Sequence, residues 1–456
     1  MVIFFSTLST GFIVVFYFFK FLKGYIQYIR SVERVDKTYQ GFIVSKKPFI
    51  YFCLQKYYWT MLKYTIITLA LLLVLLDFLA YRKLADYKLK KSIKRAFAAT
   101  VIIADIIPLI LPLSMLIFSN KNDMTSIMKI SMVLITIFLV LTICRLILYI
   151  FWLPFKSKKW LYFGGVVSFI SLLLFTYGIF VTRTDYKVSE ISLSYSNLPA
   201  VFNGYRIAFI SDIHTGSMYD AERELEDIAD IISETDADIV LFGGDIINMH
   251  HSELTPDILE KLSLIKGKHE TLAVLGNHDT GAYLNDSVIT PRCLNKKLLK
   301  EKLEGIGWVL LQDSTIYLNR NNDSIAITGI DYTDELLKFK HEFDNIEDYD
   351  VSPIYSGVDD DVFNITISHL PQLWYELCDN GYSDLTLSGH IHAMQFKYDI
   401  FGFILSPAAF VYNEWSGLYE REKGKLYIND GVGTVGFFAR LGARPEITVI
   451  TLNNGL

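Results

Sequence analysis

The sequence has few cysteines and no spacing that would pair them. Four occur in 456 residues, at Cys53, Cys144, Cys293 and Cys378. Their isolation excludes a disulfide framework or a cysteine-rich zinc cluster as the basis of the fold. Basic charge is not in excess either, since the net charge is −6 at pH 7, and nucleic acid is therefore not expected as a partner. No repeat of fixed period and no low-complexity tract occurs.

Hydrophobic residues are abundant and unevenly distributed. They make up 52% of the chain, and the mean hydropathy of +0.31 is high for a purely soluble protein. Long, predominantly apolar stretches of roughly the length needed to cross a bilayer precede residue 183. We predict five spans, at Val2–Phe19, Tyr64–Ala80, Ala96–Phe118, Ile130–Trp152 and Leu161–Thr182.

The first stretch has no basic region before it and no small-residue cleavage site after it, so a retained helix is favoured over a signal peptide. Three ionisable residues lie in or beside the spans: Asp77, Asp105 and Arg145. Charges within a membrane are often functional, but mutual pairing inside the helix bundle is the simpler expectation.

After residue 183 the hydrophobic pattern changes to short apolar runs that alternate with amphipathic helices. "YRIAFISD", "ADIVLFGGD" and "TLAVLGNHD" are typical of buried strands, and "ERELEDIADIIS" carries its apolar residues at helical spacing. Further strands follow in "SIAITGI", "FNITISH", "DLTLSGH" and "EITVITL". This pattern predicts an α/β domain with two mixed sheets flanked by helices. The expected organisation is a helical membrane region over 1–183, a linker over 184–200 and the α/β domain over 201–456.

Polar residues follow these strands directly. The motifs are "SDIH", "GGD", "GNHD", "SHLP" and "SGHIH", and together they contain five of the nine histidines. Side chains at the carboxyl ends of strands in α/β folds converge on one crevice, where such folds bind ligands. His390 and His392 are two residues apart, so in an extended segment they would share one face.

This ordered set of motifs resembles the calcineurin-like metallophosphoesterase superfamily, and within it the membrane-associated bacterial branch described as phosphodiesterases. The resemblance covers roughly residues 190 to 456. It implies two metal ions, one bound by Asp212, His214 and His392 and the other by Asn277, His369 and His390. It also implies that Asp245 bridges the two ions and that His278 faces the substrate phosphate without being a metal ligand.

A dinuclear centre of this kind suits hydrolysis of a phosphate mono- or diester. The shared carboxylate Asp245 and two divalent ions would activate a bridging hydroxide, and His278 would protonate or stabilise the leaving oxygen, with Asp279 as an orienting partner. Imidazole, carboxylate and amide ligands without thiolate favour manganese, iron or zinc over calcium. The expected substrate is a phosphorylated molecule, with a membrane lipid or lipid-linked phosphate as one option. A membrane transporter or sensor, in which the same domain only binds a ligand, is the alternative.

Two positions depart from the family pattern. Ala393 stands where many relatives carry glycine, and Asp430 stands where relatives commonly have arginine. Arg440 and Arg444 are nearby candidates for contacts with the phosphate, because a guanidinium matches phosphate geometry.

The distribution of basic residues in the loops predicts the side of the membrane on which the catalytic domain lies. Eight lysines and arginines between Lys20 and Lys56 favour a cytoplasmic first loop, and five spans then leave the catalytic domain in the cytoplasm. Seven more between Arg82 and Arg95 would lie in the external loop, which opposes this orientation.

Overall fold

The computed structural model describes residues 73–87, 90–118, 124–155, 157–283, 291–339, 346, 349–359 and 361–455. The predicted span Val2–Phe19 and residues 64–72 of the second span lie outside this part of the chain. The chain divides into two compact units, one of Met1–Ile107 with Val140–Leu172 and the other of Pro108–Leu139 with Leu173–Leu456.

Long apolar helices dominate the chain before residue 183. Residues 73–85 are helical and are followed by α3 (Lys91–Phe118), α4 (Met124–Trp152) and α5 (Lys158–Phe180). Within the described residues, two segments are long and apolar enough to cross a membrane, Lys129–Trp152 and Lys158–Thr184. They coincide with two of the five predicted spans. A third predicted span, Ala96–Phe118, is helical throughout as part of α3.

The ionisable residues of this region pair with one another, as expected. A guanidinium nitrogen of Arg145 lies 3.0 Å from Asp77 and 2.9 Å from Asp105. The hydroxyl of Tyr149 donates a hydrogen bond to Asp77. Nearby, Lys83 donates to the carbonyls of Trp152 and Leu153, each at 2.8 Å, at the end of α4. The charges are thus accounted for by mutual pairing in the first unit.

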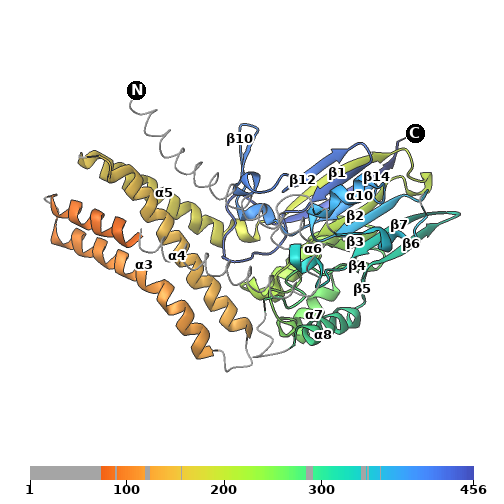
Figure 1. The fold of residues 1–456 in the computed structure, drawn as a ribbon, viewed down its shortest axis with the longest axis horizontal. Coiled ribbons are helices and arrows are strands. Elements are labelled where there is room, and N and C mark those ends of the chain that lie inside the picture. Colours follow the sequence, from red (N-terminus) through yellow and green to blue (C-terminus); the bar gives the residue numbers. More distant parts are fainter. Residues whose placement is uncertain are drawn as a thin grey trace, which may run out of the picture. The chain divides into compact units, whose positions relative to one another are not determined.

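Two six-stranded sheets form the body of the second unit (Figure 1). The first has the order β1, β14, β2, β3, β4, β5, with bounds Lys187–Tyr195, Glu446–Asn454, Tyr205–Ile210, Ile239–Phe242, Thr271–Ala273 and Trp308–Leu310. The second has the order β12, β13, β9, β8, β7, β6, with bounds Gly417–Arg421, Gly424–Ile428, Leu385–Ser388, Asn364–Ser368, Asp323–Ile330 and Ser314–Arg320. Strands β2 to β5 are mutually parallel, as are β7, β8, β9 and β13. A separate pair, β10 (Tyr398–Ile400) and β11 (Phe403–Leu405), is antiparallel.

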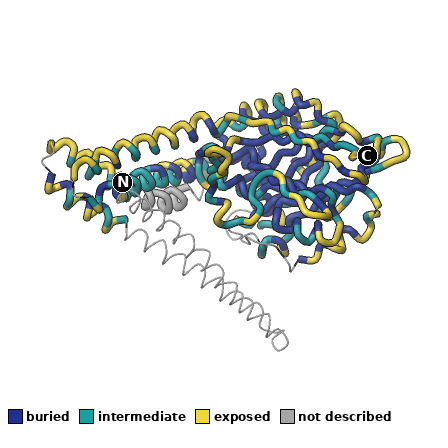
Figure 2. The backbone as a smooth tube through the Cα atoms, turned by 90° about the horizontal axis from the view of Figure 1, so that it is seen from above, coloured by how far each residue is buried: buried dark blue, intermediate teal, exposed yellow. Residues whose placement is uncertain are grey.

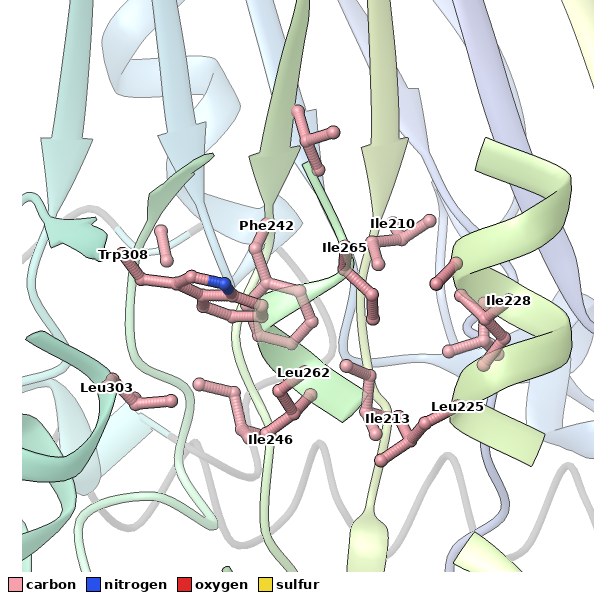
Figure 3. Close-up of a cluster of buried hydrophobic side chains, with 14 of the residues drawn as sticks. Ile210, Ile213, Leu225, Ile228, Phe242, Ile246, Leu262, Ile265, Leu303 and Trp308 are labelled. Atoms are coloured by element: carbon pink, nitrogen blue, oxygen red, sulfur yellow. The ribbon is translucent and has the colours of Figure 1, made fainter. Parts of the chain in front are cut away.

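The alternating side chains of the strands build one core between the sheets and another under the helices. On β2, Ile207 and Phe209 join the core between the sheets, whereas Ala208 and Ile210 face helices. The helices over the first sheet are α6 (Ala221–Glu234), α7 (Pro256–Ser263) and α8 (Arg292–Gly305). Figure 3 shows their side chains meeting Phe242 and Trp308. On the second sheet, α10 (Trp374–Asp379) packs against β13, and the short α9 (Ser352–Tyr355) contributes Tyr355 to a smaller cluster.

Burial follows this layering, with buried backbone concentrated in the two sheets (Figure 2). Two of the helices begin at residues that favour helix starts, since Asp220 caps α6 and Thr255 followed by Pro256 begins α7. The predicted fold class of helices and two mixed sheets is therefore confirmed for the second unit.

Two details differ from the sequence-based expectation. Residues 187–195, expected within a linker, form edge strand β1, which pairs with β14 over its whole length. The last strand, β14, follows the strands of the second sheet in the sequence but inserts between β1 and β2 of the first sheet. A sheet that closes with the final strand of the chain needs a long-range pairing, and local hydrophobic pattern carries no information about it.

Candidate metal centre

All seven predicted ligands and His278 follow the carboxyl ends of five strands, three in the first sheet and two in the second. Asp212 and His214 follow β2, Asp245 follows β3, and Asn277 with His278 follows β4. His369 follows β8, and the pair His390 and His392 follows β9. The two sheets therefore direct their polar strand ends toward one place, as the motif order predicts.

The side chains assemble into two groups that share one carboxylate. In the first group, Nε2 of His392 lies 3.0 Å from Oδ1 of Asp212 and 3.2 Å from Nε2 of His214. In the second, Nε2 of His369 lies 3.1 Å from Oδ1 of Asn277, and the imidazole of His390 stands edge-on to that of His369. Oδ2 of Asp245 lies 3.1 Å from Nε2 of His369 and 3.7 Å from Nε2 of His214. Asp245 is thus a carboxylate within reach of both groups.

Most of the site is buried, and burial holds two of its histidines in the neutral form. Asp212, His214, Asp245, His369 and His392 are at most 2% exposed. Burial, together with the neighbouring His278, lowers the pKa of His214 well below its usual value, and burial lowers the pKa of His390 to about 3. Both imidazoles are neutral at pH 7, which is the form that binds a metal. The Nε2 atoms of His214 and His392 face each other at 3.2 Å beside the carboxylates of Asp212 and Asp245, and together these groups form a donor set that fits a cation.

His369 behaves differently because of the shared carboxylate. Burial alone would lower its pKa, but the adjacent Asp245 raises it to about 9. The same pairing holds the pKa of Asp245 well below its usual range in spite of burial. Protonated His369 therefore balances the negative charge of Asp245. A bound cation would supply this positive charge instead.

The backbone of the site is strained at the ligands themselves. Positive φ angles occur at Asp212 (56°), His214 (50°), Asp245 (59°), His390 (76°) and His392 (52°). Each non-glycine residue in this region costs on the order of 1 kcal/mol, and such residues cluster at functional sites. The expectation of an extended segment from His390 to His392 is therefore wrong. The two rings reach different groups because the chain turns sharply between them.

The turn that carries His392 is left-handed over four residues, which form η7 (His392–Gln395). Ala393 has a φ of 48°, a conformation in which glycine is unstrained, so the glycine of many relatives at this position has a backbone reason. Gln395 holds the turn in place. Its side chain donates to the carbonyl of Val435 at 3.1 Å and accepts from the N–H of the same residue at 2.8 Å.

Three glycines allow the loops to approach one another. A Cβ on Gly276 would lie 2.1 Å from Oδ1 of Asp245, and one on Gly389 would lie 2.3 Å from Oδ2 of Asp212. A Cβ on Gly244 would meet His369 at 2.8 Å, and this residue also has a φ of 97°. The G-G-D, G-N-H-D and G-H-x-H motifs need these glycines because a carboxylate or imidazole occupies the space of the side chain.

His278 is oriented by a backbone carbonyl rather than by Asp279. Its Nδ1 lies 2.6 Å from the carbonyl oxygen of Asn248, and its ring stacks on Tyr283 with centroids 4.4 Å apart. The carbonyl can only accept, so Nδ1 carries the proton of this hydrogen bond and Nε2 is the ring nitrogen that it leaves available. Burial lowers the pKa of His278, although Asp245 opposes the shift.

Asp279 instead fastens the loop that carries Asp245. Its buried carboxylate accepts the N–H groups of Asp245 at 2.8 Å, Ile246 at 3.0 Å, Ile247 at 3.1 Å and Gly276 at 2.9 Å. The buried carboxylate of Glu253 holds the next segment in a similar way. It accepts the N–H groups of Asn248 at 2.7 Å and Met249 at 2.8 Å. The motif G-N-H-D pointed to Asp279, whereas nothing in the sequence pointed to Glu253, Asn248 or Gln395.

Arg440 and Arg444, the predicted phosphate contacts, are engaged by the protein itself. Arg440 is fully buried, and all three of its guanidinium nitrogens donate to backbone carbonyls, among them those of Asp430, Gly431 and Gly433. Arg444 pairs with Asp185 at 2.8 Å. Asp430, the other departure from the family pattern, pairs with Lys397 at 2.7 Å. The two arginines therefore stabilise loops.

Comparison with known proteins agrees with this geometry. The family model of calcineurin-like phosphoesterases matches residues 205–394. These residues form a calcineurin-like metallophosphoesterase domain. The domain is a metal-dependent phosphoesterase, with clustered histidine and aspartate side chains that could hold metal ions.

Some relatives of the phosphoesterase domain are named as transmembrane proteins, and others are not. The uncharacterized metallophosphoesterase YkuE of Bacillus subtilis is 28% identical over 275 residues, which cover 59% of this chain and 86% of the relative. A transmembrane protein with metallophosphoesterase domain from Danio rerio is 28% identical over 290 residues, or 62% of this chain and 61% of that protein. Phosphopantetheinyl hydrolase from Mycobacterium tuberculosis aligns in structure with 45% of this chain and 89% of its own, at 14% identity and a TM-score of 0.28.

Replacement of Asp279 by asparagine is expected to destabilise the phosphoesterase domain. An amide nitrogen would face main-chain N–H groups that now donate to a carboxylate, and hydrogen bonds to a charged group contribute roughly 1.5 to 3 kcal/mol each. We expect the apparent melting temperature of the purified full-length protein to fall by several degrees. Asp230→Asn, on the exposed face of α6, is the matched control and should leave it unchanged. Equal melting temperatures for both variants would contradict the role of Asp279.

Proposed function

We propose that this chain is a membrane-anchored phosphoesterase with two divalent metal ions, acting on a phosphate mono- or diester that is carried at a lipid surface. One observation carries the chemical part of this proposal. A single buried carboxylate, Asp245, lies within 3.7 Å of a histidine in each of two neighbouring groups. A site for one ion would need no such shared oxygen.

The residues divide into two ligand sets. Asp212, His214 and His392 would hold one ion, and Asn277, His369 and His390 would hold the other, with Asp245 common to both. The donors are imidazole, carboxylate and amide groups without a thiolate, which suits manganese, iron or zinc. When bound, such ions acidify water and stabilise the charge on phosphoryl oxygens.

The chain's own residues contribute orientation and proton transfer. The carbonyl of Asn248 fixes the His278 ring and leaves Nε2 toward the substrate. In the imidazolium form, Nε2 carries the proton that an alkoxide leaving group needs. Asp279 keeps the Asp245 loop rigid, and burial of the whole centre excludes bulk water, which strengthens each electrostatic contact.

Membrane anchoring is supported by the two membrane-length helices and by the transmembrane names of relatives from Danio rerio and Bos taurus. The catalytic domain would begin at β1, immediately after the second of these helices, rather than at residue 201. A short connection of this kind keeps the crevice close to the bilayer and raises the effective concentration of substrates held there. The cytoplasmic side remains our prediction for the domain.

The test uses the full-length protein in lipid vesicles. We expect metal analysis to find two divalent ions per chain, and we expect hydrolysis of phosphatidic acid in the same bilayer to exceed its hydrolysis in separate vesicles by at least about tenfold. Bis-p-nitrophenyl phosphate, a soluble diester, should be hydrolysed without such a difference. Metal-dependent binding of phosphate with no turnover of either ester would instead favour the alternative of a ligand-binding module on a transporter or sensor.

A further inference from the structure

A hairpin of unusual composition follows the turn that carries His392. Strands β10 and β11 pair only with each other, with Ile400 opposite Phe403, and the turn between them is Phe401–Gly402. The hairpin stands out from the two large sheets (Figure 1). An isolated pair of strands is marginally stable in water, so its conformation needs support from something outside the pair.

The tip of the hairpin is apolar and exposed. The relative exposure is 106% for Phe401, 70% for Phe403, 49% for Ile400 and 47% for Ile404. Single exposed hydrophobic residues are normal on protein surfaces, but four within five residues form a contiguous apolar patch, which marks an interaction site.

The turn itself does not require these residues. Phe401 has a φ of 55° and Gly402 a φ of 84°, and the first position of such a turn is usually asparagine, aspartate or glycine. The turn is closed by Asp399, whose carboxylate accepts the N–H of Gly402 at 2.7 Å. Phenylalanine at position 401 is thus unfavourable for the backbone, which indicates that its side chain has another use.

The base of the hairpin is tied to the end of the membrane-length helix α5. The carbonyl of Gly178 accepts the N–H of Arg440 at 3.2 Å, and a Cβ on Gly178 would lie 2.7 Å from Leu441. Leu441 in turn donates to the carbonyl of Gln395 at 2.8 Å and accepts from Lys397 at 3.0 Å. A short series of direct contacts therefore connects the last turn of α5 to residues 395–397, which directly precede β10.

The same segment of α5 is apolar and exposed up to the contact. Leu173 is 52% exposed, Leu174 50%, Tyr177 57% and Phe180 76%. The loop 437–441, which contacts Gly178 of α5, also contacts the other membrane-length helix, because the N–H of Phe438 donates to Oγ1 of Thr136 in α4 at 2.8 Å. If these helices lie in lipid, the boundary of the bilayer falls beside the loop 437–441, which contacts the residues directly before the hairpin.

We propose that the tip of the β10–β11 hairpin, from Ile400 to Ile404, inserts into the bilayer beside the end of α5. This inference rests on the membrane anchoring in the proposed function. Large apolar side chains on a small protruding element are typical of segments that enter the headgroup and acyl boundary. Since β10 begins three residues after Gln395, the insertion would also hold the His392 turn, and with it one wall of the metal centre, next to the lipid surface.

Spin labels in the full-length protein test this placement. In a background with the four cysteines replaced by serine, single cysteines are introduced by Phe401→Cys, Asn322→Cys and Leu174→Cys, and each is labelled after reconstitution into phosphatidylcholine vesicles. Asn322 is the matched control, because it lies in the exposed turn of the β6–β7 hairpin of the same domain. Collision of each label with oxygen, which concentrates in lipid, and with a water-soluble nickel chelate is then measured.

We expect the label at position 401 to show at least about threefold higher oxygen-to-nickel accessibility than the label at position 322. The label at position 174 should resemble the one at 401. A lipid signature at 174 with an aqueous signature at 401 would overturn the hairpin insertion alone, whereas an aqueous signature at 174 would overturn the membrane anchoring as well. Low accessibility of position 401 to both reagents would show that the tip is covered by protein, such as a second copy of the chain, and would also overturn the proposal.

Discussion

Replacement of Asp245 by asparagine is expected to abolish phosphoesterase turnover. Oδ2 of Asp245 lies close to histidines of both groups, and its Oδ1 accepts the N–H of His278 at 2.9 Å. The variant keeps the size of the side chain but removes the negative charge that two cations would share. Mutation of a residue that only contacts a metal ligand already lowers activity or metal affinity roughly 10- to 100-fold. Asp245 is itself a proposed ligand, so we expect a larger loss of turnover and fewer than two ions per chain by metal analysis.

A matched control separates this effect from general damage. Asp384 is a partly buried aspartate at the opposite end of the second sheet, where it accepts the N–H of Asn364 at 2.7 Å. Asp384→Asn should lower stability while the metal content stays at two ions. If Asp245→Asn retained both ions and normal turnover, the assignment of Asp245 to both metals would be wrong.

Much of the fold was predictable because each strand of the domain has a local signature. The runs around Ile207, Val240 and Ile365 are short and apolar, and the amphipathic segment before Thr235 is capped and periodic. Parallel strands place their carboxyl ends together, so the motifs that follow them had to meet. For this reason the positions of Asp212, Asp245 and His369 could be inferred without a structure.

What the sequence did not reveal depends on pairings between distant segments. The insertion of β14 beside β2 and the pairing of β1 with β14 join residues more than 200 positions apart. Arg440 resembled a phosphate ligand because arginine often is one, yet its partners are carbonyls of a loop that only the folded chain creates. An isolated charged side chain in a sequence does not show whether it faces a substrate or the protein.

The hairpin shows the same limitation. By composition, the aromatic stretch 408–419 is a candidate for contact with lipid, because tryptophan and tyrosine favour the membrane boundary. Two of its aromatic side chains, Tyr412 and Trp415, are only partly exposed, whereas Phe401 and Phe403 a few residues earlier are largely exposed. Composition alone favoured the first segment, and exposure in the fold favours the second.

Removal of the His278 imidazole is expected to slow turnover while both metal ions remain bound. The ring is held by the carbonyl of Asn248 and by stacking on Tyr283, and in our assignment it is not a ligand. A general acid contributes roughly 10²- to 10⁴-fold, so His278→Ala should lose a factor in this range for an alkyl phosphate ester.

His278→Gln is the matched variant, because a glutamine can still donate a hydrogen bond but cannot release a proton. With p-nitrophenyl phosphate, whose leaving group needs no proton, the loss should shrink to about tenfold or less. Equal losses on both esters, with two ions retained, would mean that His278 positions the phosphate instead of protonating the leaving group, and loss of metal from His278→Ala would make it a ligand.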